Sequence, residues 1–305
     1  MRGLLRHIGP GFLLAGAAIG VSHLVQATRA GADYGVVLIF AILIACLTKY
    51  PFMEFGSRYA SATGKNLIDG YRTLGPGYLK VFALITISTM FIIQAAVTIV
   101  SAGLAEYLFE FGWSNFTWSL LLLIFCILIL LIGKYKKLDF LMKIVINFLT
   151  VCTLFSVVVA AFQIDFSSIS FNKSPELWTL SGVGFVITLT VTYAFPRVMS
   201  KLIQSGKQSR KEQKTYQLFI IVIPVVALGI LYTLKSTFTV LVDFATGLSF
   251  LASPVLAWFN LKLMTNKNNK IMISSGYLLF SKVCLFFLVC FGLGYIVYEV
   301  FNYLG

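Results

Sequence analysis

Charged residues are scarce in this sequence. Only 11% of its 305 residues are Asp, Glu, Lys or Arg, whereas about 25% is usual for a soluble domain. Proline is also rare, with 7 residues, which excludes a Pro-rich disordered chain. Because 59% of the residues are hydrophobic, polar groups cannot cover the whole surface. A soluble protein is therefore excluded.

Residues for metal, redox or acid–base chemistry are few as well. The 5 cysteines all fall in apolar stretches and none forms a Cys-x-x-Cys pair, so zinc, haem and thiol-redox sites have no support. The 2 histidines and the few acidic residues inside apolar stretches form no catalytic dyad or nucleophile arrangement. We therefore expect no enzyme activity and no bound cofactor.

Long hydrophobic runs are what the sequence has in abundance. A run of about 20 apolar residues is long enough to cross a bilayer as a helix. About nine such runs occur, at residues 10–28, 36–55, 81–108, 116–132, 138–162, 180–199, 216–234, 240–261 and 273–300. The sequence therefore predicts an all-α membrane protein that forms one transmembrane domain over residues 1–305, with the lipid bilayer around it.

The basic residues predict how these helices are oriented. With the N-terminus in the cytoplasm, all of the 24 Lys and Arg residues except Arg29, Lys173 and Lys235 fall in cytoplasmic segments or at their edges. Such an excess is typical of cytoplasmic loops, so we expect an N-in, C-out topology. The basic cytoplasmic segments also account for the net charge of +13, so a nucleic-acid partner is not needed to explain this charge.

The first run has the most unusual composition. It holds Gly16 and Gly20, followed by Ser22, His23 and Gln26. Small residues let helices pack closely, which is one interpretation. The other is a helix broken at residues 20–23, where freed carbonyls and the imidazole face a cavity and bind a solute. Gly20, Ser22, His23 and Gln26 are then the candidate substrate-binding residues, and His23 is a candidate metal ligand.

Three further polar residues lie in or beside apolar runs. Glu54 follows Pro51 at the end of the second run, and Asp243 begins the eighth. Both are candidates for a proton or ion pathway, although Glu54 has the alternative of pairing with a basic neighbour. Gln94 lies in the middle of the third run, where we expect it to hydrogen-bond to another helix.

Several motifs resemble the Nramp family of divalent-metal transporters. They are Gly9-Pro10-Gly11-Phe12-Leu13, Gln26-Ala-Thr-Arg-Ala30-Gly31-Ala32-Asp33-Tyr34-Gly35, Ala62-Thr63-Gly64-Lys65-Asn66-Leu67, and Val242-Asp243-Phe244-Ala245-Thr246 with Ser253-Pro254. The resemblance implies a partial LeuT-type inverted-repeat fold, with an intact first five-helix repeat over residues 1–162 and an incomplete second repeat of four helices over residues 179–305. It also implies proton-coupled transport of a divalent metal ion across the cell membrane, with the bacterial inner membrane as the expected location.

Two departures from this family bear on function. Its members carry Asp-Pro-Gly-Asn in the broken first helix, where this sequence has Gly20, Val21, Ser22 and His23. Nothing here resembles the Met-Pro-His-like motif of the sixth family helix, and the last four runs resemble family helices eight to eleven. Two functions stay open: a transporter of a metal ion or another small solute, and a shortened relative without transport activity that acts as a partner or scaffold or has no function. The sequence predicts no oligomeric state.

Overall fold

The computed structural model describes residues 38–132, 175–203, 210–233, 238–266, 269 and 271–304. The first and fifth predicted runs, at residues 10–28 and 138–162, lie outside these ranges. So do four of the predicted site residues, namely Gly20, Ser22, His23 and Gln26.

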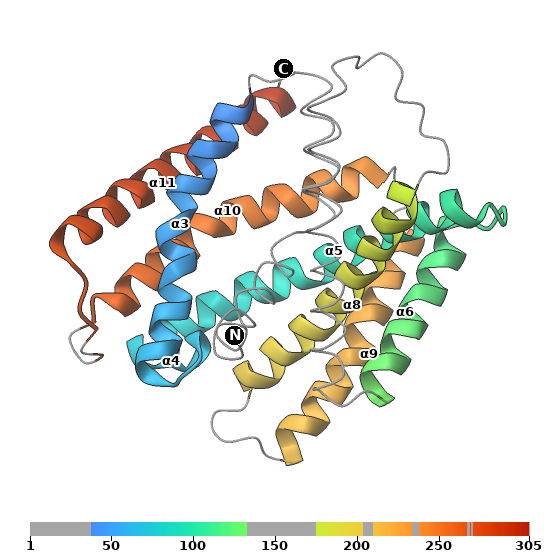
Figure 1. The fold of residues 1–305 in the computed structure, drawn as a ribbon, viewed down its shortest axis with the longest axis horizontal. Coiled ribbons are helices and arrows are strands. Elements are labelled where there is room, and N and C mark those ends of the chain that lie inside the picture. Colours follow the sequence, from blue (N-terminus) through green and yellow to red (C-terminus); the bar gives the residue numbers. More distant parts are fainter. Residues whose placement is uncertain are drawn as a thin grey trace. The chain divides into compact units, whose positions relative to one another are not determined.

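Eight α-helices and no strand occur in the described residues (Figure 1). The helices are α3 (Leu38–Thr63), α4 (Leu67–Leu74), α5 (Pro76–Phe109), α6 (Asn115–Ile132), α8 (Pro175–Ile203), α9 (Arg210–Thr233), α10 (Phe238–Met264) and α11 (Ser275–Leu304). Every predicted run in the described ranges overlaps one of them, and α4 is the helix that hydropathy did not predict. The prediction of a helical protein is confirmed for this part of the chain.

Four of these helices are long and apolar enough to cross a membrane. They contain the segments Pro76–Phe109, Lys211–Thr233, Val240–Met264 and Ser275–Phe301. A helix suits such a segment because each backbone N–H and C=O in hydrocarbon must find a partner within the segment itself. The number of nine spans and the N-in, C-out topology stay predictions.

The connection between α3 and α4 shows how local sequence ends one helix and starts the next. Gly64 adopts a φ of 67°, a left-handed conformation that glycine tolerates at a helix end. Two residues later, the Asn66 side chain accepts a hydrogen bond from the backbone N–H of Asp69 at 2.9 Å. This N-cap satisfies one of the free N–H groups of the first turn of α4, which supports a helix of 8 residues, or about two turns.

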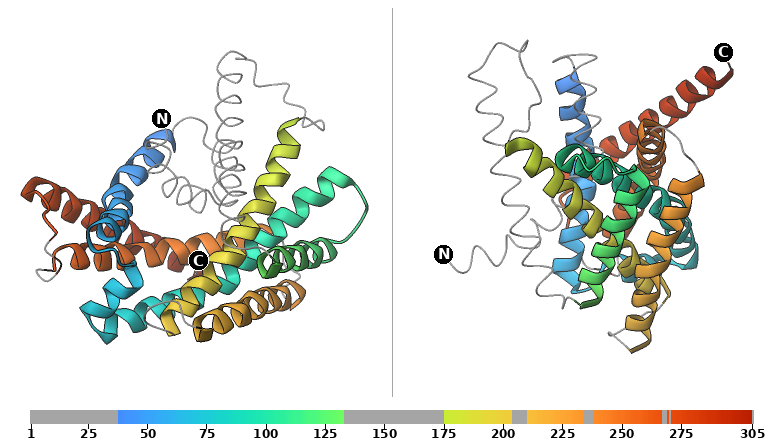
Figure 2. Two further views of the ribbon diagram at one scale, coloured as in Figure 1. Left: turned by 60° about the horizontal axis from the view of Figure 1, so that its bottom comes forward. Right: turned by 90° about the vertical axis from the view of Figure 1, so that its right-hand side faces the viewer.

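The described residues divide into two compact units, and the division falls inside α5, α8 and α10. The first unit comprises residues 90–132, 175–200, 210–233 and 238–243. In it α6 packs along α9, as Figures 1 and 2 show from three directions. The core between these helices and α8 holds Cys126, Leu130, Leu189 and Ile220, all of them buried.

The second unit comprises residues 38–89, 201–203, 244–266, 269 and 271–304. Here α3 packs against α11 (Figure 1). The core is aromatic, with Phe55, Tyr59, Tyr71 and Phe259 buried. Phe55 lies edge-on to the ring of Tyr277, at 5.9 Å between centroids and 88° between planes. Edge-to-face pairs of this kind stabilise beyond the apolar area that they bury.

A glycine allows α4 to lie close to its neighbours in the second unit. A Cβ atom on Gly70 would lie 2.7 Å from Cδ2 of Leu263 on α10, and 3.0 Å from two ring carbons of Tyr59 on α3. Atoms at such distances overlap, so any side chain at this position would push the neighbours away. The small residue therefore sets how near α4 comes to α3 and α10.

A proline inside α3 frees a carbonyl that another helix then contacts. Pro51 has no N–H, so the carbonyl of Leu47, four residues earlier, has no helical donor. The thiol of Cys284 on α11 donates to this carbonyl, with 3.9 Å between sulfur and oxygen. Because Leu47 pairs with Cys284 and Glu54 pairs with Tyr277, α3 and α11 run antiparallel.

Candidate functional site

The carboxylate of Glu54 joins α3 to α11 in the second unit. Its Oε1 accepts a hydrogen bond from Arg58 Nε at 2.7 Å, and its Oε2 accepts one from the Tyr277 hydroxyl at 3.1 Å. The guanidinium of Arg58 lies 5.4 Å from the centroid of the Tyr277 ring, within the range of a cation–π contact. Glu54 therefore does pair with a basic neighbour, and three side chains make one closed cluster, here called the Glu54 cluster.

This cluster is only partly shielded, since the side chains of Arg58 and Glu54 are 38% and 25% exposed. An ion pair exposed to this extent contributes about 0.2 to 1 kcal/mol to stability. Protonation would replace an acceptor with a donor at one oxygen and weaken the ion pair with Arg58. The link between α3 and α11 is thus sensitive to the charge of Glu54.

A second polar link in the same unit ties three helices together. The hydroxyl of Tyr71 on α4 donates to Oδ1 of Asn260 on α10, and Nδ2 of Asn260 donates to the Phe52 carbonyl on α3 at 3.1 Å. Burial raises the pKa of the Tyr71 hydroxyl well above its ordinary value, because the charged form would lose its hydration. The hydroxyl therefore stays a neutral donor.

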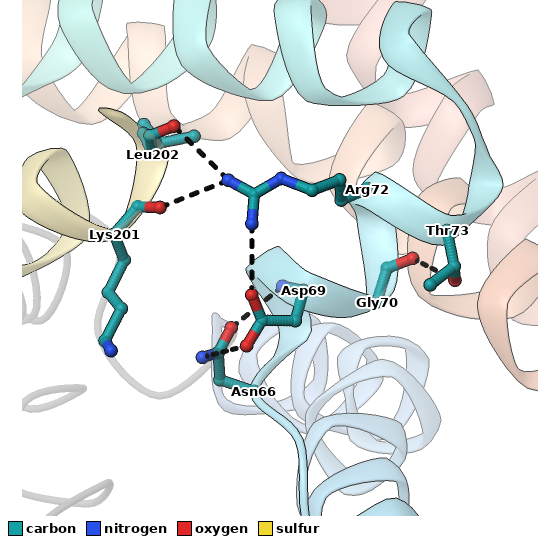
Figure 3. A network of polar contacts seen from close by, with 7 residues as sticks. All are labelled: Asn66, Asp69, Gly70, Arg72, Thr73, Lys201 and Leu202. Atoms are coloured by element: carbon teal, nitrogen blue, oxygen red, sulfur yellow. Dashed lines mark hydrogen bonds and ion pairs between the residues drawn. The ribbon is translucent and has the colours of Figure 1, made fainter. Parts of the chain in front are cut away.

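Arg72 on α4 binds the end of α8, as Figure 3 shows. One guanidinium nitrogen lies 3.2 Å from a carboxylate oxygen of Asp69. The other donates to the carbonyls of Lys201 and Leu202, each at 3.4 Å. A helix ends with carbonyls that lack helical donors, and a cation there also interacts favourably with the helix dipole. Arg72 is therefore a cap supplied by another helix.

A buried polar seam lies between α5 and α8 in the first unit. It consists of Gln94, Thr98 and Ser101 on α5 and of Thr188 and Thr192 on α8, with exposures between 0% and 3%. Nε2 of Gln94 donates to Thr98 Oγ1 at 3.3 Å and across to Thr192 Oγ1 at 3.0 Å. The hydroxyls of Ser101 and Thr188 are 2.8 Å apart. We call these five residues the Gln94 seam.

The seam confirms that Gln94 hydrogen-bonds to another helix. One polar atom in it is not satisfied, however: Oε1 of Gln94 is buried and has no hydrogen-bond partner within the part of the chain that the structure describes. Buried polar atoms almost always have such a partner. An orphan acceptor near the middle of a helix that can cross a membrane therefore needs an explanation.

Comparison with known proteins places this sequence in a family. The sequence profile of Nramp, described as "Natural resistance-associated macrophage protein-like", matches residues 11–172, which is more than half of the chain. The chain belongs to the Nramp family. Nramp proteins are membrane transporters of divalent metal ions and protons, not enzymes. The matched range includes Glu54 and Gln94 but ends before α8.

One curated relative extends this comparison. The chain is 34% identical over 186 residues to an uncharacterized protein of Pasteurella multocida (strain Pm70). The alignment covers 60% of this chain and 42% of that relative, so this Nramp chain matches less than half of the relative's length. No solved structure matches the chain.

The structure describes two of the predicted site residues of this Nramp protein, Glu54 and Asp243. Glu54 lies in the cluster described above, and Asp243 is exposed on α10 in the first unit. The predicted metal ligand His23, with Gly20, Ser22 and Gln26, lies outside the described residues. Inside them no group of three or more His, Cys, Asp or Glu side chains is placed to hold a metal ion.

Sequence reasoning missed four members of the Gln94 seam. Their spacing was a usable signal, because residues 94, 98 and 101 share one face of a helix, as do 188 and 192. Ser and Thr hydroxyls often bond only to the backbone of their own helix, so this spacing alone does not indicate a contact between helices. Which α5 residue faces which α8 residue depends on tertiary packing, which no local pattern contains.

Proposed function

We propose that this chain is an integral membrane secondary transporter of the cell membrane that moves a divalent metal cation or another small solute. The observation that carries the proposal is the Nramp match over residues 11–172, which spans the first predicted run and α3 to α6. The bacterial relative supports a bacterial inner membrane as the location.

The substrate site we propose is the first run, at Gly20, Ser22, His23 and Gln26. Where the family has an Asp and an Asn for the metal, this chain has Gly20 and His23. Carboxylate oxygen suits manganese, whereas imidazole suits copper, nickel or zinc. We therefore expect little or no manganese uptake, and any metal binding should depend on the His23 imidazole.

Glu54 and Asp243 are the residues we propose for a proton or ion pathway. The geometry of Glu54 supports this role, since its side chain is partly exposed and accepts a hydrogen bond from a second helix. A change in its protonation would alter the contact between α3 and α11. Asp243 is supported by its exposure on α10.

The test is uptake of radiolabelled metal ions into proteoliposomes, with and without an inward proton gradient, across manganese, zinc, nickel and cobalt. We expect saturable uptake of at least one softer ion that falls with His23→Ala. His7→Ala is the matched control, because His7 is the other histidine, and it should leave uptake unchanged. Robust manganese uptake that His23→Ala does not alter would contradict the proposed site. No uptake of any ion would favour a shortened relative without transport activity.

Topology provides a separate check on the proposal. Asn115→Cys should react with an impermeant maleimide only from outside the cell, because residue 115 falls in a predicted outer segment. Lys207→Cys is the control and should react only from the cytoplasmic side. Reaction of Asn115→Cys from the cytoplasmic side alone would reverse the predicted orientation.

A further inference from the structure

The Gln94 seam contains a backbone oxygen that has lost its helical donor. Pro196 lies inside α8 and carries no N–H, so it cannot bond to the carbonyl of Thr192, four residues earlier. Thr192 is the residue whose hydroxyl accepts from Gln94, and both Thr192 and Pro196 are buried. The freed carbonyl therefore belongs to the residue that Gln94 contacts.

Every side-chain hydrogen-bond donor of Gln94, Thr98 and Thr192 already has an acceptor. Both amide hydrogens of Gln94 go to the hydroxyl oxygens of Thr98 and Thr192. The Thr98 hydroxyl donates to the Gln94 carbonyl at 2.7 Å, and the Thr192 hydroxyl donates to the Thr188 carbonyl at 2.7 Å. A hydroxyl has one donor and two acceptor positions, so each threonine keeps one free lone pair. Only acceptors are left over.

Exchanging the oxygen and nitrogen of the Gln94 amide does not remove this imbalance. The amide nitrogen would then occupy the position where no partner lies, and the oxygen would face two hydroxyls that already donate to their own helices. Either orientation leaves one amide group unmatched within the described residues. The orientation with the oxygen unmatched keeps every other hydrogen bond of Gln94, Thr98 and Thr192, so it is the favoured one.

We propose that Gln94, Thr98 and Thr192 form a binding site for a monovalent cation, sodium or potassium. The ligands are Oε1 of Gln94, the freed Thr192 carbonyl and the remaining lone pairs of the two hydroxyls. Neutral carbonyl and hydroxyl oxygens can replace the hydration shell of such an ion. The inference rests on the proposed transport function in one respect, because an ion bound here would be carried with the solute.

The charge of the site favours a monovalent ion over a divalent one. No acidic side chain in the described residues contacts Gln94, Thr98 or Thr192. The cost of removing an ion from water rises with the square of its charge, and sites for divalent ions in proteins supply carboxylates to offset it. Neutral oxygens near the middle of two helices offset the smaller cost of a single charge.

The experiment measures equilibrium binding of radiolabelled sodium, and of rubidium as a label for potassium sites, to the full chain in detergent. Ionic strength is held constant with N-methylglucamine, an organic cation too large for the site. We expect saturable binding of one of the two ions, and a higher unfolding temperature in its presence, because a ligand of the folded state stabilises it. An excess of manganese should compete no better than N-methylglucamine.

Three variants locate the site. Gln94→Leu removes the orphan oxygen and should weaken binding by about tenfold or more. Gln94→Glu puts a carboxylate in its place and should tighten binding above the pKa of that carboxyl. Thr86→Val is the matched control on α5, since among the described residues the buried Thr86 hydroxyl bonds only to the Phe82 carbonyl. The affinity of this variant for the ion should equal that of the wild type.

Four results would overturn the assignment: no saturable monovalent binding by the wild type, equal affinity in Gln94→Leu, unchanged affinity in Gln94→Glu, or displacement of the bound ion by manganese at equal concentration. If Gln94→Leu does not fold, the ion affinity of Gln94→Glu tests the assignment in its place. Binding in detergent needs no gradient or solute. A chain that binds sodium but takes up no solute contradicts the proposed function alone, and one that takes up solute without binding sodium or potassium contradicts this inference alone.

Discussion

The two units of this protein contain different kinds of polar contact. The Gln94 seam in the first unit is neutral and almost completely buried. The Glu54 cluster in the second unit contains an ion pair whose side chains are 38% and 25% exposed. Each joins two antiparallel helices, α5 with α8 and α3 with α11.

The difference follows from the cost of burial. A charge in a low-dielectric interior loses more hydration energy than one partner returns, whereas amide and hydroxyl groups lose little if they are hydrogen-bonded. The neutral seam can therefore lie near the middle of its helices, and the charged cluster lies where solvent reaches it. The cluster therefore presents charged groups, and the seam presents buried neutral oxygens.

The largest expected effect comes from the aromatic support of the Glu54 cluster. Phe55 is fully buried and packs against Tyr277, so Phe55→Ala should lower the free energy of unfolding by about 3 to 5 kcal/mol. Unfolding in SDS mixed micelles, followed by circular dichroism, measures this. Phe286→Ala on α11 is the control, because Phe286 is 66% exposed; equal effects of the two would show that the aromatic core does not support the cluster.

A smaller effect is expected for the ion pair of the Glu54 cluster, and its dependence on salt should distinguish this cluster from the Gln94 seam. A double-mutant cycle of Glu54→Gln and Arg58→Gln should give a coupling energy of about 0.5 to 1 kcal/mol, as for other partly exposed pairs. It should shrink between low and high salt, because mobile ions screen exposed charges. A coupling that salt does not change would mean that the pair is shielded as fully as the seam.

The neutral seam should behave in the opposite way. Ser101→Ala and Thr188→Val remove two hydroxyls that lie 2.8 Å apart. Hydrogen bonds between membrane helices contribute about 0.6 kcal/mol on average, and we expect a coupling of this size that is independent of salt. The same unfolding assay measures it. A salt-dependent coupling would contradict the neutral, buried character of the seam.

The smallest effect concerns the cap on α8. Arg72→Gln removes a cation from two terminal carbonyls and should cost about 0.3 kcal/mol, the lower end of the usual range for a charge at a helix end, because both contacts are long. Hydrogen exchange should quicken at the last residues of α8, since the ends of helices open first. Lys80→Gln on α5 changes the same charge at an exposed position and should leave the exchange of α8 unaltered. Equal effects of the two variants would rule out the cap.

The features that sequence predicted are those with a local cause. Hydropathy located α5, α10 and α11 because each is a continuous apolar segment. It passed over α4, since that helix is short and amphipathic, although Asn66 followed by Asp69 is an N-cap signal. The pairing of Glu54 with Arg58 also follows from their spacing of four residues.

The remaining features depend on residues far apart in the sequence. Tyr277 lies 223 residues after Glu54, and Thr192 lies 98 residues after Gln94. Neither partner could be chosen from a pattern within one helix, because many Tyr and Thr residues occur in other apolar runs. The predicted substrate residues Gly20 and His23 lie outside the described residues, so that part of the site stays a prediction.

The bond from Cys284 to the Leu47 carbonyl has a consequence for biosynthesis. These residues are 237 positions apart, which corresponds to roughly 10 to 50 s of synthesis at about 5 to 20 residues per second. Throughout that time α3, a predicted span, has a carbonyl that Pro51 leaves without a donor, and such a group is costly in lipid. Phe52 and Glu54 also await partners on α10 and α11. The insertion machinery or water must therefore accommodate the polar groups of α3 until the ribosome has delivered the first turns of α11.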